Sequence, residues 1–142
     1  MSRDDIEVLV HRYSDAVVHG DADRWIGTWA VDGIWDLGND RRVEGRDAIL
    51  ELWQRAMARF DAVVQTVMNG ACDLDGAVGT GRWYIHEVMQ RGNGERSLMV
   101  GHYDDRYVRT DDGWRFAERS LVQHYAGPGD LSGSFRAADG TP

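Results

Sequence analysis

Apolar residues in the first part of the chain recur at the spacing of helices. Over residues 4–19 they return every three or four positions, which predicts an amphipathic helix whose apolar face comprises Ile6, Leu9, Val10, Tyr13, Val17 and Val18. Gly20 ends this helix, and Asp21 or Asp23 is suited to cap a second, short helix. The apolar face of that second helix is expected to consist of Trp25 and Trp29.

A short strand and a third helix are expected next. The Asp32-Gly33 pair is typical of a turn and precedes a predicted strand, Ile34–Leu37, after which a polar loop runs to Asp40. Gly45 precedes a helix that we expect from Arg46 to about Phe60. The apolar stripe of this third helix comprises Ile49, Leu52, Trp53, Ala56 and Met57.

The second half of the chain has the pattern of strands. Four β-rich runs are expected at residues 63–71, 80–91, 96–109 and 114–125. Hairpin turns are expected between them, at Asp73-Leu74-Asp75-Gly76, Gly92-Asn93-Gly94 and Asp111-Asp112-Gly113. Helices followed by an antiparallel meander predict one α+β domain over residues 1–126 and argue against a βαβ fold. The segment 127–142 is rich in Gly, Ser and Ala, and we expect it to be a flexible tail.

Composition excludes several kinds of chemistry. The formal net charge is −8, which argues against a nucleic-acid partner because phosphate binding requires a basic patch. All 16 basic residues are arginine, so no lysine can form a Schiff base. Cys72 is the single cysteine, and no Cys/His spacing indicates a metal site, so we expect neither a metal nor another cofactor. No apolar stretch suits a signal peptide or a membrane span, and we expect a cytoplasmic protein without a membrane partner.

The order and spacing of five short motifs resemble those of the NTF2-like superfamily, and within it the SnoaL-like branch that includes scytalone dehydratase, ketosteroid isomerase and hexachlorocyclohexane dehydrochlorinase. The resemblance implies a cone of three N-terminal helices on a curved, mostly antiparallel sheet with an internal pocket. It also implies a homodimer formed through the outer face of the sheet. The motifs are Arg12-Tyr13, Gly20-Asp21-x-Asp23, Asp32-Gly33-x-Trp35, Gly45-Arg46-x-x-Ile49 and Asp112-Gly113-Trp114-Arg115-Phe116.

Comparison with ketosteroid isomerase implies an oxyanion-binding pair. Tyr13 falls where that enzyme has a donating tyrosine, and Asp105 falls where it has a protonated aspartic acid. A phenol and a neutral carboxylic acid together would stabilise an enolate in an apolar pocket. The position of the base is taken by Leu37, which accepts no proton, and Asp36 should point to the opposite face of its strand.

Comparison with the dehydrochlorinase implies an incomplete acid–histidine dyad. Asp21 matches the acid, but Met68 stands where the histidine would be. Arg119 matches a pocket arginine that could contact an anion or a leaving group. The Arg-x-Asp strand that an epoxide hydrolase on this fold needs should lie within residues 82–88, and it is absent there.

Strand alternation predicts which residues line the pocket. Met99, Gly101, Tyr103, Asp105 and Tyr107 should share a face, with Gly101 leaving room for a ligand, and Arg119 should share its face with the following odd positions. Three histidines, His86, His102 and His124, should face the other side of the sheet unless a bulge reverses one of them. The expected substrate-binding residues are Trp35, Leu37, Met68, Trp83, Ile85, Met99, Tyr103, Leu121 and Gln123.

Each candidate also has a structural interpretation. Tyr13 could be a core residue, Asp21 a helix cap, and Asp105 the partner of Arg119 or Arg109 in a structural ion pair.

The residues therefore support three hypotheses. The first is a cofactor-independent dehydratase, isomerase or cyclase that acts by acid–base chemistry on a planar carbonyl-bearing or phenolic molecule. Its base would be Asp21, with Glu87 or a histidine in reserve. The second is a non-catalytic small-molecule-binding or dimeric scaffold protein that has lost the dyad. The third is an accessory protein resembling the small subunit of ring-hydroxylating dioxygenases.

Overall fold

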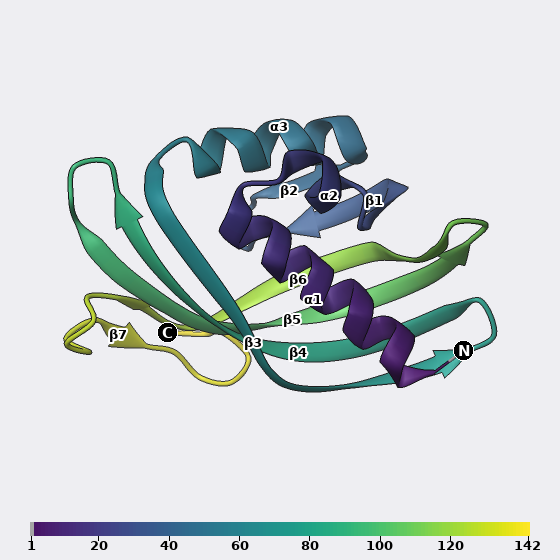
Figure 1. Ribbon diagram of the computed structural model, residues 1–142. Coiled ribbons are helices and arrows are strands. Elements are labelled where there is room, and N and C mark those ends of the chain that lie inside the picture. Colours follow the sequence, from purple (N-terminus) through teal and green to yellow (C-terminus); the bar gives the residue numbers. More distant parts are fainter. Residues whose placement is uncertain (1) are drawn as a thin grey trace.

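Three helices lie over the concave side of a curved sheet in the computed structural model of this chain, which describes residues 2–142 (Figure 1). The helices are α1 (Arg3–His19), α2 (Ala22–Ile26) and α3 (Arg46–Met57). The strands are β1 (Trp29–Asp36), β2 (Arg42–Glu44), β3 (Phe60–Asp75), β4 (Val78–Arg91), β5 (Arg96–Thr110), β6 (Gly113–Gly127) and β7 (Ser134–Phe135). The predicted α+β class and the curved, mostly antiparallel sheet are confirmed.

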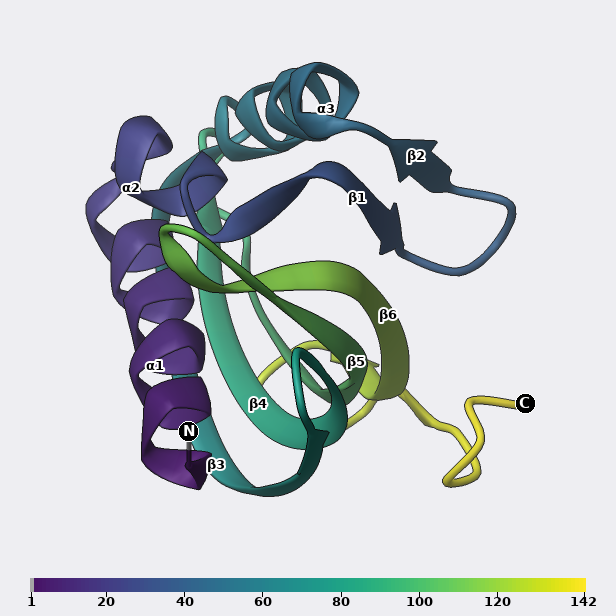
Figure 2. The same cartoon turned by 90° about the vertical axis from the view of Figure 1, so that its right-hand side faces the viewer.

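The sheet has the strand order β2-β1-β6-β5-β4-β3, and β7 pairs with β6. Strands β3 to β6 form the antiparallel meander, whereas β1 runs parallel to β6. Figure 2 shows β4, β5 and β6 curving around the space beneath the helices. This curvature gives the sheet a concave inner face, which packs against the helices, and a convex outer face.

Several element boundaries differ from the prediction. Helix α2 ends early because the Thr28 hydroxyl and backbone N–H both bond to the Trp25 carbonyl, so Trp29 begins β1 instead of continuing the helix. Phe60 likewise begins β3 and does not belong to α3, since it pairs with Arg91 across the sheet. Of the four residues predicted as a turn at 73–76, only Gly76 lies outside the strand. Asp73 still pairs with Thr80 across the hairpin. Strand β2 was missed because its three residues are mostly exposed and carry no apolar pattern.

Aromatic side chains fill the space between the helices and the sheet. The rings of Trp25 and Trp53 stack with centroids 4.5 Å apart and an interplanar angle of 10°. Trp29 and Phe116 pack beside them, and both are fully buried. Burying rings of this size supplies much of the hydrophobic stabilisation of a small domain. The tryptophan stripe expected from the sequence therefore belongs mainly to the core.

The tail is partly held on the sheet. Strand β7 pairs with β6 through Tyr125–Phe135 and Ala126–Ser134, and the Tyr125 hydroxyl donates to the Pro128 carbonyl at 2.6 Å. The segment expected to be flexible thus contains regular pairing at residues 134–135. Among residues 2–142, no helix is long and apolar enough to cross a membrane.

Candidate active site

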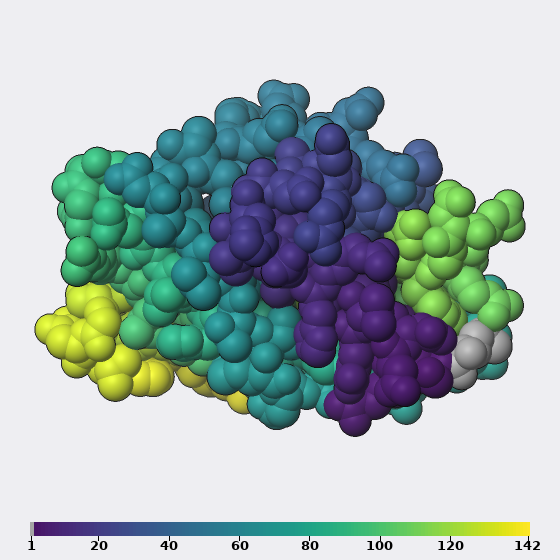
Figure 3. All heavy atoms as spheres, in the orientation of Figure 1, coloured from purple at the N-terminus to yellow at the C-terminus, as the bar shows by residue number. Residues whose placement is uncertain are grey.

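A cavity of about 820 Å³ lies between the helices and the concave face of the sheet. This volume suits a small organic molecule of several rings. Its deep part is walled mainly by apolar and aromatic side chains, including Val17, Trp35, Trp53, Met57, Val63, Met99 and Leu121. Its mouth is bounded by exposed residues of the loops that follow β1, α3 and β4. In Figure 3, α1 and α2 cover the middle of the visible face, and the yellow tail lies beside the β4–β5 turn.

Most of the residues that strand alternation predicts to line the pocket lie on this cavity. Tyr13 also lies on the cavity, together with six residues expected to bind substrate: Trp35, Leu37, Met99, Tyr103, Leu121 and Gln123. Leu37 and Trp35 share the inner face, as predicted, whereas Asp36 accepts the backbone N–H of Gly38.

Three expected substrate-binding residues lie elsewhere. Met68 is 44% exposed and sits in a bulge of β3 between Val67 and Gly70, so it does not face the cavity. Trp83 is buried outside the cavity lining, where its indole N–H donates to the Tyr107 hydroxyl at 2.9 Å. Ile85 is a fully buried core residue.

Gly101 also has a role other than the expected one. A Cβ atom there would lie 2.5 Å from the Val122 carbonyl oxygen, so the glycine permits close approach of β6 and does not make room for a ligand.

Two tyrosine hydroxyls meet inside the cavity. Tyr13 reaches it from α1 and Tyr103 from β5, and their oxygens are 3.4 Å apart. Burial raises the pKa of both phenols above its ordinary value, and the negative charge of Glu87 adds to the rise. Both groups are therefore protonated near neutral pH, and the pair has a hydroxyl hydrogen to donate to a ligand oxygen.

A partly buried carboxyl group lies on the same cavity. Glu87 of β4 accepts one hydrogen bond, from the Gln65 side-chain nitrogen at 2.7 Å. The Ser14 hydroxyl in turn donates to the Gln65 amide oxygen at 2.8 Å, which fixes the direction of the amide. No arginine or histidine of residues 2–142 forms an ion pair with Glu87, and burial raises the pKa of its carboxyl group. A carboxyl group with a raised pKa can both accept and return a proton.

Sequence reasoning had named Glu87 only as a reserve base. The available signal was its position two residues after Ile85 and four after Trp83, which places all three on the inner face of β4.

Replacing Glu87 with glutamine should stabilise the protein at neutral pH. The folded-state pKa of Glu87 is raised, so ionisation costs more in the folded than in the unfolded chain. The cost is absent below the unfolded pKa and is complete once the pH exceeds the folded pKa. We expect a gain in unfolding free energy of about 0.5–2 kcal/mol at pH 7 that disappears near pH 4. Urea denaturation at both pH values checks this, and an equal effect at both would contradict it.

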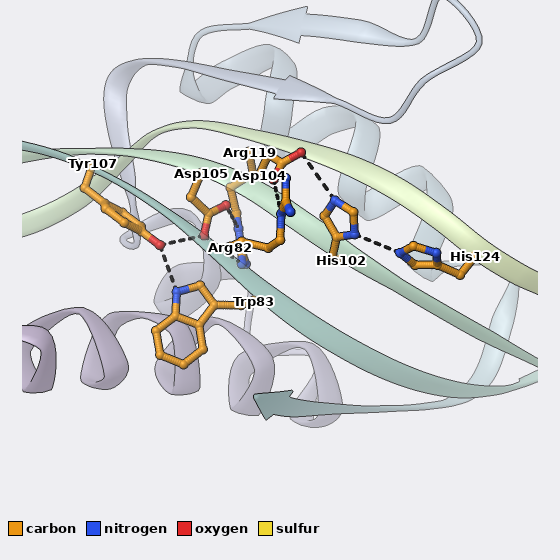
Figure 4. A network of polar contacts seen from close by, with 8 residues as sticks. All are labelled: Arg82, Trp83, His102, Asp104, Asp105, Tyr107, Arg119 and His124. Carbon is orange, nitrogen blue, oxygen red and sulfur yellow. Dashed lines mark hydrogen bonds and ion pairs between the residues drawn. The ribbon is translucent and has the colours of Figure 1, made fainter. Parts of the chain in front are cut away.

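Asp105 is not a donor in this cavity. It lies outside the cavity lining and accepts hydrogen bonds from Arg119 Nε at 2.8 Å, from Arg119 Nη2 at 3.2 Å and from the Tyr107 hydroxyl at 2.9 Å (Figure 4). Burial raises the pKa of Asp105, but three donors around one carboxyl group favour its ionised form. The expected protonated aspartic acid is thus replaced by the alternative, a structural ion pair with Arg119.

The Arg119 guanidinium packs against the rings of the two phenols. Its guanidinium lies 4.5 Å from the Tyr13 ring centroid and 4.0 Å from that of Tyr103. Burial alone would lower the pKa of Arg119, but the Asp105 carboxylate, together with Tyr13 and Tyr103, more than offsets this effect, and the pKa is raised. The positive charge opposes the rise in pKa of both phenols. Arg119 itself does not line the cavity, so it does not make the expected direct contact with a ligand.

The remaining candidates lie away from the cavity. Asp21 caps α2, where its side chain accepts the backbone N–H of Arg24 at 3.1 Å, as the structural interpretation predicted. The side chains of His102 and His124 bond to each other at 2.8 Å (Figure 4). His102 also contacts Asp104, and neither Asp104 nor these two histidines lines the cavity. His86 is absent from the cavity lining as well. None of the histidines of residues 2–142 lines the cavity.

Comparisons with known proteins agree with this architecture. The sequence profile of the SnoaL-like domain matches residues 1–120. Among curated proteins, none matches the sequence.

Solved structures show the same fold. A scytalone dehydratase-like protein from Novosphingobium aromaticivorans aligns with a TM-score of 0.82 and 17% identity over 92% of this chain and 89% of its own. A hexachlorocyclohexane dehydrochlorinase from Novosphingobium barchaimii aligns with a TM-score of 0.81 and 18% identity, covering 95% and 93% of the two chains. A protein of unknown function from Mycobacterium tuberculosis aligns with a TM-score of 0.77 and 25% identity, covering 95% of this chain and 78% of its own.

Proposed function

Because this chain belongs to the SnoaL-like family, we propose that it is a cofactor-independent enzyme that moves a proton on a planar carbonyl compound. The observation that carries the proposal is Glu87, a partly buried carboxyl group that faces the cavity without a cationic partner among residues 2–142. Leaving a carboxylate in such a place is costly for folding, and perturbed acids of this kind cluster at functional sites.

In the proposed reaction, the substrate carbonyl oxygen accepts hydrogen bonds from the Tyr13–Tyr103 pair. The unbonded Glu87 oxygen removes a proton from the carbon next to the carbonyl, and the electron pair of that C–H bond moves onto the carbonyl oxygen to give an enolate. The phenols stabilise the new negative charge, with the Arg119 charge behind their rings.

The enolate then collapses in one of two ways. If Glu87 returns the proton to another carbon, the reaction is an isomerisation. If the proton goes to a departing hydroxyl group, water leaves and the reaction is a dehydration. The apolar side chains of the deep part favour both, because they reduce the contact of the charged intermediate with water.

The test is solvent exchange at the carbon next to a carbonyl. 2-Tetralone is a suitable probe because it is planar at one end and has exchangeable α-protons. In D₂O, the wild-type protein should accelerate deuterium uptake above the background rate, as followed by mass spectrometry. Tyr13→Phe should reduce the acceleration about 10²-fold or more, the effect typical of losing one oxyanion donor.

A matched control separates a chemical role from a packing role. Tyr125→Phe removes a hydroxyl that lies outside the cavity lining and bonds to Pro128. It should leave the exchange rate near that of the wild type. If the wild type binds 2-tetralone without accelerating exchange, the protein is instead a small-molecule-binding member of its family. We also propose that the protein is a homodimer, and sedimentation velocity tests this separately.

A further inference from the structure

Four arginines surround the mouth of the cavity. Arg41 lies in the β1–β2 loop, Arg59 between α3 and β3, and Arg91 and Arg96 at the two ends of the β4–β5 connection. All four are exposed. Glu95 is the single acidic residue beside them in the cavity lining, apart from the deep Glu87.

This concentration of positive charge contrasts with the chain as a whole, whose formal net charge is −8. Elsewhere in the described residues, arginines such as Arg42, Arg82 and Arg106 form ion pairs with carboxylates. None of the mouth arginines does so within residues 2–142. Their charges are thus not compensated by the protein, although they converge from three separate loops.

The other contacts of these arginines leave their charge available. Arg96 donates to the side-chain oxygen of Gln90 at 3.0 Å, and the Arg91 guanidinium lies 5.1 Å from the Phe60 ring centroid. The side chains of Arg41 and Arg59 have no hydrogen-bond or ion-pair partner among residues 2–142. A guanidinium that is free at a cavity mouth is well suited to bind a carboxylate through two parallel hydrogen bonds.

We propose that the substrate carries a carboxylate at the end opposite its reacting carbonyl group, and that the mouth arginines bind it. This inference rests on the proposed function and adds the class and orientation of the substrate. Glu87 at the deep end repels a negative group, whereas the mouth attracts one. A carboxylate-bearing molecule therefore enters with its neutral end first, which brings the carbonyl oxygen to the two phenols. The local positive field also speeds capture of an anion by an otherwise acidic protein.

The test compares two planar ligands of nearly the same shape, one negatively charged and one neutral. The probes are 6-hydroxynaphthalene-2-carboxylate and the corresponding carboxamide, with binding measured by calorimetry at low and high salt. The carboxylate should bind about tenfold more tightly at low ionic strength. Salt already screens exposed charges beyond about 10 Å at 0.1 M and screens them more strongly at higher concentration. The ratio of the two affinities should therefore fall toward one in about 0.5 M NaCl.

Matched variants assign the preference to the mouth. Arg41→Gln combined with Arg59→Gln should abolish most of the preference while leaving carboxamide affinity unchanged. Arg109→Gln is the control, because Arg109 is exposed, lies at the far end of β5 and does not line the cavity. It should leave the preference intact.

The outcomes separate this inference from the proposed function. Equal affinity of the wild type for both probes would overturn the carboxylate inference and leave the enzyme proposal standing. A preference that depends on Arg41 and Arg59, combined with no effect of Tyr13→Phe on either probe, would support the mouth site and count against the phenol pair. Failure of the wild type to bind either probe would overturn the inference.

Discussion

Replacing Glu87 with glutamine is expected to lower the rate of 2-tetralone exchange by about 10²–10⁴-fold, the range typical of losing a general acid–base group. Glutamine has nearly the same shape, and its amide oxygen can still accept the hydrogen bond from Gln65 that Glu87 accepts at 2.7 Å. The change therefore removes the ability to take a proton without removing the position of the side chain. The rate is measured by mass spectrometry in D₂O at pH 7.

Two comparisons make this result specific to Glu87. Glu95→Gln alters the exposed carboxylate at the mouth of the same cavity and should leave the rate within about threefold of wild type, as expected for a change in one screened surface charge. Affinity of the Glu87→Gln protein for 6-hydroxynaphthalene-2-carboxamide should persist, because the phenols are unchanged. If exchange survives in this variant, Glu87 is not the base and the proposed mechanism fails.

If Glu87→Gln loses most of the exchange rate but gains stability, the ionised Glu87 side chain serves the reaction at a cost to folding. An ordinary core substitution lowers stability and activity together. A catalytic acid with a raised pKa does the opposite, because its ionisation opposes folding while it enables chemistry. Measuring both properties on one variant therefore tests whether Glu87 is kept for function.

The fold followed from local patterns because these are set by short-range physics. Helical periodicity located α1, and strand alternation put Tyr103 and Leu121 on the inner face. Alternation fixes the face of a residue but not its position along the cone. Trp83 faces inward as expected, yet it packs against the Tyr107 end of the sheet and outside the cavity lining. Local patterns contain no measure of how far the cavity extends along the sheet.

The Asp105–Arg119 pair depends on an irregularity that no local pattern reveals. At the β5–β6 hairpin, Thr110 pairs with Gly113, and continuing this register would place Glu118 opposite Asp105. A shift between Arg106 and Tyr107 instead brings Arg119 opposite Asp105. A bulge of one residue thus replaces a repulsive pair of acids with an ion pair. Since bulges depend on tertiary packing, the role of Asp105 could not be chosen from the sequence.

Replacing Asp105 with alanine should lower the free energy of unfolding by about 3–5 kcal/mol, the cost of leaving a buried charge without its partner. The side chains of Arg119 and Asp105 are 1% and 0% exposed, so water cannot replace the lost carboxylate. Asp104→Ala is a matched control on the other face of the same strand. Asp104 is 45% exposed and pairs with Arg82 at 2.7 Å, and its loss should cost about 1 kcal/mol or less. Urea denaturation at pH 7 measures both.

A double variant distinguishes an unpaired charge from a simple packing defect. Asp105→Leu combined with Arg119→Met removes both charges and keeps apolar volume, so it should recover most of the stability lost in Asp105→Ala. Recovery would show that Asp105→Ala loses stability because it leaves the buried Arg119 charge without a partner. A double variant as unstable as Asp105→Ala would instead assign the loss to the cavity left by the side chain. Equal losses in Asp104→Ala and Asp105→Ala would contradict the assignment of the buried pair as the structural support of the phenols.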